Sequence, residues 1–303
     1  MDFRQLSYFV RVAELGSMSR AATALGVTQP MLSRHMSRLE QDVGKPLLTR
    51  HGHGVRPTAA GRQLLEHGKG ILHQVELARA ALTTDDASAG RVVIGLPPSV
   101  CRHVAVPLVD AFRRAHPEAS LGIVEGMTVA MQEWLAAGRL DGALLHDPAP
   151  APGLDYETLW SEDLCLVSPA RRAPKTGRIT LAALAGYPLI LPSRPNAVRR
   201  LIDAAAAQAG ITLDVALDID AIPSVVDLVA AGHGHAVLSR IALASWSRAR
   251  GLHATPIVRP ALTGTVVLAT RRDRPLTPLV RATLELIRAD IVPDVRRLVR
   301  GRH

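Results

Sequence analysis

The side chains with the most distinctive chemistry near the N-terminus are Gln29, Ser33 and Arg34. At helical spacing they share a polar face, and Leu32 and Met36 lie on the opposite apolar stripe. In a DNA major groove, arginine pairs with guanine and glutamine pairs with adenine. The pattern therefore indicates base recognition, with an ordinary amphipathic surface helix as the alternative.

A glycine-rich segment with basic ends follows at residues 50–56, Arg-His-Gly-His-Gly-Val-Arg. Glycines at this spacing favour a hairpin. Next to a DNA-recognition helix, such a hairpin is typical of a wing whose arginines, Arg50 and Arg56, contact phosphates or the minor groove. His51 and His53 alone make an incomplete metal site, because zinc sites in proteins take three or four protein ligands. We expect no metal there.

Positive charge accumulates in the same part of the chain. Residues 1–58 hold eight lysines and arginines against four acids, a formal charge of +4 in a chain whose net charge is +9. This excess favours a polyanionic partner. A solvated basic surface is the alternative. For the separate group of arginines that ends the chain, a solvated surface is our interpretation.

Helical periodicity predicts three short helices that hold these side chains, over residues 3–15, 20–25 and 29–42. Ser17 or Ser19 caps the second helix, and Thr28 caps the third, with Pro30 tolerated in its first turn. The tight turn between the second and third helices is typical of a helix-turn-helix.

A long helix is predicted from about residue 58 to residue 83. Apolar or small residues recur in it with 4-3-4-3-4 spacing, at Leu64, Gly68, Ile71, Val75, Ala78 and Leu82. This spacing is typical of a coiled-coil seam and favours dimerisation, with packing on the protein's own core as the alternative. Residues 85–90 break the pattern and are expected to form a hinge.

Strands and helices alternate from residue 91 onward. We expect strands at 91–96, 121–125, 142–146, 164–168, 189–191, 215–219, 236–239 and 265–269, and helices at 99–115, 127–137, 197–209, 224–231 and 276–291. Alternation of this kind is typical of an α/β domain with mainly parallel sheets. Ligands bind such sheets where strands end and helices begin.

Length and composition exclude several classes. At roughly 150 residues per domain, 303 residues suggest about two domains. Cys101 and Cys165 cannot form a disulfide framework. The first residues lack the layout of a signal peptide, and no run of about 18 uncharged apolar residues spans a membrane. We therefore expect a cytoplasmic protein without membrane contact.

An ordered set of residues over the first sixty positions resembles the LysR-type transcriptional regulators. The set comprises Phe9, Gly16-Ser17, Arg20-Ala21-Ala22, Leu25, Val27, Gln29-Pro30, Leu32-Ser33-Arg34, Leu39-Glu40, Gly44, Pro46-Leu47, Arg50, Thr58 and Ala60-Gly61. Leu48 departs from the family's usual phenylalanine but stays apolar. The resemblance covers essentially the whole chain. Gly95-Leu-Pro-Pro-Ser99, Glu125-Gly-Met127, Leu191-Pro-Ser-Arg-Pro195 and Ile222-Pro-Ser-Val225 look closest to the nitrogen-assimilation control subgroup.

The resemblance implies a fold and a domain organisation. It implies a winged helix-turn-helix at 1–58, a linker and dimerisation helix with its hinge at 59–88, and an α/β effector domain at 89–303. That domain has two subdomains similar to periplasmic binding proteins, one at about 89–162 and 266–303 and the other at about 163–265. The implied assembly is a homodimer or homotetramer.

The resemblance also implies site residues. The positions that contact DNA are Gln29, Pro30, Ser33 and Arg34, with Arg50 and Arg56 in the wing. The positions that contact an effector are Pro98, Ser99, Thr128, His146, Ser193, Arg194, Ile222 and Ser224. Hydroxyls near helix starts suit an organic anion. The implied partners are promoter DNA, RNA polymerase and a small effector, with no cofactor.

Three other classes remain open. An enzyme is disfavoured because the chain has no phosphate loop, dinucleotide fingerprint, Gly-x-Ser-x-Gly or His-Glu-x-x-His motif. A solute-binding transport protein would share the C-terminal architecture but not the helix-turn-helix. A constitutive DNA-binding regulator with a vestigial cleft is the alternative that sequence separates least.

Overall fold

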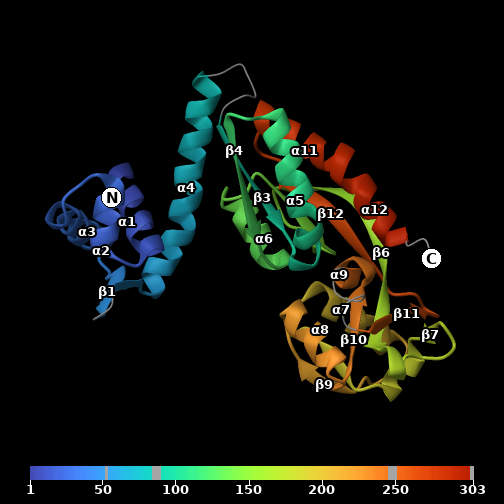
Figure 1. The fold of residues 1–303 in the computed structure, drawn as a ribbon. Coiled ribbons are helices and arrows are strands. Elements are labelled where there is room, and N and C mark those ends of the chain that lie inside the picture. The colour runs from blue at the N-terminus through green and yellow to red at the C-terminus, as the bar shows by residue number, and fades with distance from the viewer. Residues whose placement is uncertain (52–53, 84–89, 245–250, 301–303) are drawn as a thin grey trace. The chain divides into compact units, whose positions relative to one another are not determined.

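The computed structural model describes residues 1–51, 54–83, 90–244 and 251–300. The chain divides into two compact units. The N-terminal unit comprises Met1–Thr83 with Ala137–Arg139, and the C-terminal unit comprises Thr84–Ala136 with Leu140–His303. Figure 1 shows the first unit as a group of helices and the second as strands covered by helices. No helix among the described residues is long and apolar enough to cross a membrane.

Three helices build the start of the N-terminal unit: α1 (Phe3–Leu15), α2 (Met18–Leu25) and α3 (Gln29–Val43). Each ends at a glycine with left-handed backbone, a conformation that costs glycine least. The Ser17 side chain caps α2, so this helix begins two residues before the predicted start. Thr28 caps α3 as predicted. Buried side chains from all three helices, including Phe9, form one core.

A two-stranded hairpin follows, formed by β1 (Leu48–His51) and β2 (Gly54–Pro57). The Glu40 carboxylate accepts hydrogen bonds from the amides of Leu47 and Leu48, at 2.8 and 3.0 Å, and so fixes the hairpin to the end of α3. The Val55 amide donates to the Gly16 carbonyl at 2.9 Å. A Cβ on Gly54 would lie 2.4 Å from that carbonyl oxygen, so this close approach requires glycine.

Helix α4 (Ala59–Thr83) contains the predicted seam, and the seam residues differ in what they contact. Leu64 packs on the unit's own core. A Cβ on Gly68 would lie 3.0 Å from side-chain atoms of Leu6 and Val10, so α1 covers this position. Ile71 is 45% exposed. The first part of the seam therefore follows the alternative of packing within the chain, and Ile71 stays available on the surface.

The C-terminal unit is built on a ten-stranded sheet with a main order of β4-β3-β5-β12-β6-β10-β8-β9, to which β11 and β7 attach. The strands are β3 (Gly90–Leu96), β4 (Ala119–Glu125), β5 (Gly142–His146), β6 (Leu154–Pro169), β7 (Ile179–Thr180), β8 (Leu189–Leu191), β9 (Val215–Asp218), β10 (His235–Ser239), β11 (Leu252–Val258) and β12 (Thr263–Arg271).

Helices cover each half of this sheet (Figure 1). The first half, with β3, β4, β5 and β12, carries α5 (Pro98–Ala115), α6 (Thr128–Ala136), α11 (Pro278–Leu286) and α12 (Val292–Arg300). A π-helical turn, Ile287–Ile291, joins α11 to α12, so the predicted last helix continues to Arg300. The second half, with β7 to β11, carries α7 (Ala197–Gln208) and α8 (Ile222–Ala230). Helix α9 (Arg240–Ala244) contributes Ile241 to the core of the first half and Leu243 to that of the second.

The long strand β6 links the two halves. Its first part, from Leu154 to Asp163, pairs with β12, and its last part pairs with β10 and β11. All three pairings are antiparallel, whereas β3 pairs in parallel with β4 and β5, and β8 pairs in parallel with β9 and β10, so antiparallel strands join two predicted parallel parts into one mixed sheet. Only residues 164–168 of this strand, and nothing of β11, were expected from the sequence pattern.

Candidate nucleic-acid interface and ligand cleft

The polar face of α3 is on the surface. Gln29, Pro30 and Arg34 are exposed and Ser33 is partly exposed, and we call these four residues the recognition face. On the other side of the same helix Leu32, Met36 and Leu39 are buried in the core. The helical spacing that predicted two faces is thus confirmed, and one face is presented outward.

Two hydrogen bonds hold side chains of the recognition face. The Ser19 hydroxyl donates to Gln29 Oε1 at 3.0 Å, which leaves the amide nitrogen of Gln29 with its donor capacity. Arg50 Nη2 donates to the Ser33 hydroxyl at 2.9 Å, so the first strand of the hairpin is tied to α3. Arg34 makes neither a hydrogen bond nor an ion pair within the described ranges.

The wing presents its arginines to solvent. Arg50 faces Val55 across the hairpin, and Arg56 faces Thr49, and both arginines are exposed. His51 is exposed, and His53 lies outside the described residues. Within the part of the chain that the structure describes, no three His, Cys, Asp or Glu side chains converge as metal ligands do.

The C-terminal unit contains a cleft of about 340 Å³. Its walls come from the starts of α5, α6, α7 and α8, the end of β5, the middle of β6 and the loop after β8. Seven of the eight effector positions expected from the sequence line it: Pro98, Ser99, Thr128, His146, Ser193, Arg194 and Ile222. The structure thus brings together side chains that are far apart in the sequence.

Ser224 does not line the cleft. The sequence pattern placed a helix start there, but α8 begins at Ile222, so Ser224 falls in the first turn and is exposed. The neighbouring Val225 points inward and lines the cleft instead. Ser224 therefore lies outside the cleft lining, because a shift of two residues rotates a helical position away from its neighbour's face.

The hydroxyls at the mouth of the first half are bonded within the protein. Ser99 Oγ lies 2.8 Å from His146 Nε2. Thr128 Oγ1 donates to the His146 carbonyl at 3.1 Å and accepts from the His146 amide at 3.2 Å, which ties α6 to the end of β5. Burial lowers the pKa of His146 to about 4, so its imidazole is neutral near pH 7.

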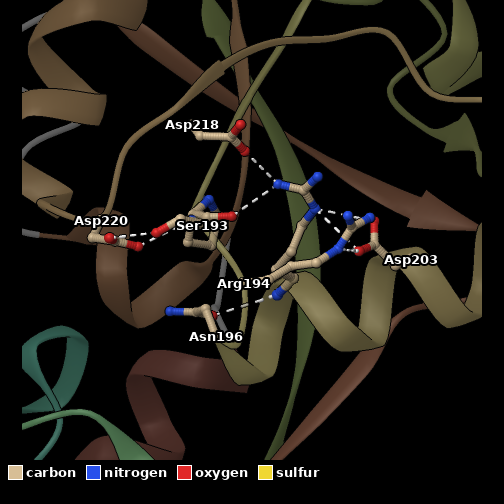
Figure 2. A network of polar contacts seen from close by, with 8 residues as sticks. Ser193, Arg194, Asn196, Asp203, Asp218 and Asp220 are labelled. Atoms are coloured by element: carbon tan, nitrogen blue, oxygen red, sulfur yellow. Dashed lines mark hydrogen bonds and ion pairs between the residues drawn. The ribbon is translucent and has the colours of Figure 1, made fainter.

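The polar groups on the second half are also paired (Figure 2). Asp220 accepts hydrogen bonds from the Ser193 amide at 3.0 Å and the Ser193 hydroxyl at 2.5 Å. Arg194 Nε lies 2.7 Å from an oxygen of Asp203, a carboxylate that Arg199 also contacts at 3.0 Å. The Arg194 charge is therefore neutralised by the protein itself.

Three acidic residues of the cleft, Asp147, Glu162 and Asp220, were not expected from the sequence. Glu162 is only 3% exposed, and its Oε2 has no hydrogen-bond partner among the described residues. Burial raises the pKa of Glu162 to about 7, against the effect of a hydrogen bond with Ser239, and repulsion by Asp147 adds to the rise. The local sequence Ser-Glu-Asp resembles an exposed turn and gave no sign of this burial.

Comparison with protein families gives two matches that together span most of the chain. Residues 3–62 match the bacterial regulatory helix-turn-helix protein family of the LysR type, and residues 85–291 match the LysR substrate binding domain. A nitrogen assimilation regulatory protein, Nac of Escherichia coli K12, is 32% identical over 297 residues, 97% of each chain. Nac of Klebsiella aerogenes is 32% identical over 289 residues, 95% of this chain and 94% of that one.

Solved structures give the same result for the whole fold. CbnR, a LysR family transcriptional regulator, superposes with a TM-score of 0.71 at 26% identity and covers 99% of this chain and 100% of its own. CbnR complexed with its target DNA also gives 0.71 at 26% identity, over 95% of this chain and 99% of that one. A full-length OxyR variant from Pseudomonas aeruginosa matches in fold, with a TM-score of 0.70 at 22% identity, over 100% of this chain and 98% of that one.

Proposed function

Because this chain belongs to the LysR family of transcriptional regulators, DNA-binding proteins with a substrate-binding effector domain, we propose that its recognition face binds promoter DNA and that a small molecule in its cleft controls that binding. The observation that carries the DNA part is the exposed face of α3 with Arg34 unpaired among the described residues. A similar regulator, CbnR, is known in complex with its target DNA.

Each residue of the recognition face has a distinct role in this proposal. Arg34 and Gln29 contact base edges, since a guanidinium fits guanine and an amide fits adenine. Pro30 brings the helix start close to the groove without an amide N–H to satisfy. Ser33 contacts DNA once Arg50 has released the Ser33 hydroxyl and bound a phosphate instead. Arg50 and Arg56 of the wing supply phosphate contacts, which add affinity without sequence preference.

We assign the domains accordingly. Residues 1–58 form the winged helix-turn-helix, 59–88 the linker and hinge, and 89–303 the effector domain with subdomains at about 89–162 plus 266–303 and about 163–265. Support comes from β6 and β12, which pair with each other and join the two halves of the sheet. A ligand that favours one arrangement of the halves shifts the population of the regulator's states.

Assembly and partners complete the proposal. The chain acts in the cytoplasm as a homodimer or homotetramer, contacts RNA polymerase at the promoter and catalyses no reaction. The exposed Ile71 on α4 supports a helix-helix contact between copies. Replacing Ile71 and Val75 with glutamate should lower the mass measured by light scattering to that of one chain. An unchanged mass would remove α4 from the interface.

The experiment that tests the DNA assignment is mapping of the purified chain on genomic DNA, followed by titration of one bound site. Discrete peaks with an inverted repeat are expected, because a two-fold dimer binds two half-sites. In that titration Arg34→Ala is compared with Arg114→Ala, which removes an exposed arginine of α5 and is the matched control. Diffuse binding that salt abolishes would leave only a polyanion-binding surface.

One observation favours constitutive DNA binding as a second candidate. Ser99, Thr128 and Ser193 already bond to protein groups, as they would in a cleft that needs no ligand. Glu162, which has an unsatisfied buried oxygen, favours a ligand. DNA affinity that no cleft-binding molecule alters would establish the constitutive regulator.

A further inference from the structure

The charges that line the cleft are predominantly acidic. Asp147, Glu162 and Asp220 carry carboxyl groups, and Arg194 is the cation among the described lining residues. Arg194 is held by Asp203 at 2.7 Å, and its side chain is 70% exposed. His146 is neutral near pH 7 because burial lowers its pKa to about 4. An anionic ligand would therefore meet carboxylates without a cation free to balance it.

Glu162 is the group that most needs a ligand. It lies on β6 where the strand exchanges β12 for β10 as its partner, between Asp163, opposite Thr263, and Ser161, opposite Thr265. Its Oε2 is fully buried and has no hydrogen-bond partner among the described residues. A buried carboxylate oxygen without a partner loses its hydration without compensation, so such groups are rare unless a site uses them.

Asp147 adds a second carboxyl group beside Glu162, and repulsion between the two raises the pKa of Glu162 beyond the effect of burial. Asp147 has a φ of 38°, a left-handed conformation that costs energy for a residue with a side chain. Its amide donates to the Thr265 carbonyl and its Oδ1 accepts from the Thr265 amide, each at 2.9 Å. These bonds fix the carboxyl group at the edge of the first half.

Gly264, which pairs with Glu162 across the sheet, keeps the carboxyl group of Asp147 accessible. A Cβ on Gly264 would lie 3.2 Å from Asp147 Oδ2, so a side chain there would crowd the oxygen that Thr265 leaves unbonded. Arg200 donates to the backbone carbonyl of Asp147 at 3.0 Å, and its charge opposes the rise in the pKa of Asp147 that burial causes. The second carboxyl group thus retains an oxygen for a ligand.

Apolar side chains form the remaining walls, among them Leu164, Ile190, Leu201, Ile222 and Val237. Such walls suit an organic body and not a hydrated ion. A metal ion is disfavoured as well, since no three metal-ligating side chains converge within the described residues.

We propose that the effector is an organic cation, an ammonium or amidinium group on an apolar body, whose N–H donors bind Glu162 and Asp147. The inference rests on the proposed function and specifies the ligand class of its cleft, in place of the organic anion expected from the hydroxyls near helix starts. An N–H donor satisfies Glu162 Oε2, and a positive charge removes the repulsion between the two carboxylates.

The same position connects the ligand to regulation. Glu162 on β6 and Gly264 on β12 face each other in the sheet register, in the segment that joins the two halves. A cation bound there draws Asp147 of the first half and Glu162 of the linking strand onto one ligand. Binding therefore acts on the segment that sets how the halves meet.

Calorimetric titration of the full chain with matched probes tests the inference. One set is hexylamine, hexanol and hexanoate, and the other is benzylamine, benzyl alcohol and benzoate, so each set varies the charge on one apolar body. The amines are expected to bind at least about tenfold more tightly than the alcohols and acids. Glu162→Gln should remove that preference, and Asp147→Asn should reduce it. Glu118→Gln, at an exposed residue outside the cleft, is the control and should retain it.

Each other outcome overturns the inference. Acids that bind more tightly than amines, amines that bind Glu162→Gln and the unchanged chain equally, or amines that do not bind at all would each do so. Titrating DNA with and without the bound amine separates this from the proposed function. If an amine binds through Glu162 without changing DNA affinity, the cation site is supported and the control of DNA binding by the cleft is contradicted. If a carboxylate changes DNA affinity, control by the cleft is supported and the cation site is contradicted.

Discussion

The recognition face of α3 and the cleft hold their polar groups in opposite ways. On α3, the four residues come from one helix, lie at the surface and include an arginine without a partner in the described chain. In the cleft, the polar groups come from separate strands and helices and are largely bonded to one another, apart from a buried carboxyl oxygen. A surface for a long polyanion can keep its charge hydrated until DNA arrives. A site for a small molecule must carry its charge already desolvated.

The largest effect should come from removing a core side chain beneath the recognition face. Phe9 is fully buried in the N-terminal core, and Phe9→Ala should lower the free energy of unfolding of that unit by about 3–5 kcal/mol. Phe3→Ala makes the same chemical change at a side chain that is 44% exposed, and should cost far less. Thermal unfolding and DNA titration measure both variants.

This substitution also tests the separation of the two regions. Amine binding in the cleft should persist in Phe9→Ala, because the cleft belongs to the other compact unit. If Phe9→Ala and Phe3→Ala had equal effects on unfolding, the assigned core would be wrong.

The next effect concerns pH and the buried carboxyl group of the cleft. Folding raises the pKa of Glu162 from 4.5 to about 7, so this residue's contribution to stability is present below pH 4.5 and is lost as the pH rises through 7. Glu162→Gln should remove that loss. The unfolding free energy of the variant, relative to that of the unchanged chain, should therefore rise by on the order of 3 kcal/mol across this range. Denaturant unfolding at a series of pH values measures it.

His146 provides the opposite sign in the same cleft. Folding lowers its pKa from 6.5 to about 4, so its contribution to stability is present above pH 6.5 and is lost as the pH falls through 4. Because His146 keeps some exposed surface, we expect the smaller effect here. His146→Asn should therefore lose stability relative to the unchanged chain as the pH rises. The same slope for both variants would contradict the burial of Glu162.

On the DNA side, Arg34→Ala should abolish discrimination between the target site and random DNA at the base pair it contacts. The expected loss is about 1–3 kcal/mol for one bidentate contact. Competition binding with the site mutated one base pair at a time measures it. Gln29→Ala should relax a different base pair, and unchanged discrimination in Arg34→Ala would remove α3 as the recognition helix.

The smallest effect belongs to the wing. Arg56→Ala should weaken binding to all DNA sequences similarly and reduce the slope of log affinity against log salt by about 1, because one phosphate contact is lost. Titrations at several salt concentrations on target and random DNA provide the slope. A change confined to the target sequence would move Arg56 from phosphate contact to base recognition.

Prediction from sequence succeeded where the physical cause is local. The end of α1 at Gly16 and the start of α3 after the Thr28 cap followed from local signals, and the two faces of α3 followed from helical spacing. It failed at β6, where only the last part of a long strand was expected, because the polar run Ser161-Glu162-Asp163 interrupts the apolar pattern although Glu162 is buried in the folded chain. It also placed the start of α8 at Ser224, two residues after its observed start at Ile222.

The sequence by itself determined the family, the recognition face and seven of the residues that line the cleft, because caps, helical periodicity and ordered motifs act over a few neighbouring residues. The tertiary structure alone decided the character of the cleft. It buried Glu162, placed Asp147 beside it and paired Arg194 with Asp203. Desolvation depends on which distant segments pack around a side chain, and no local spacing contains that information.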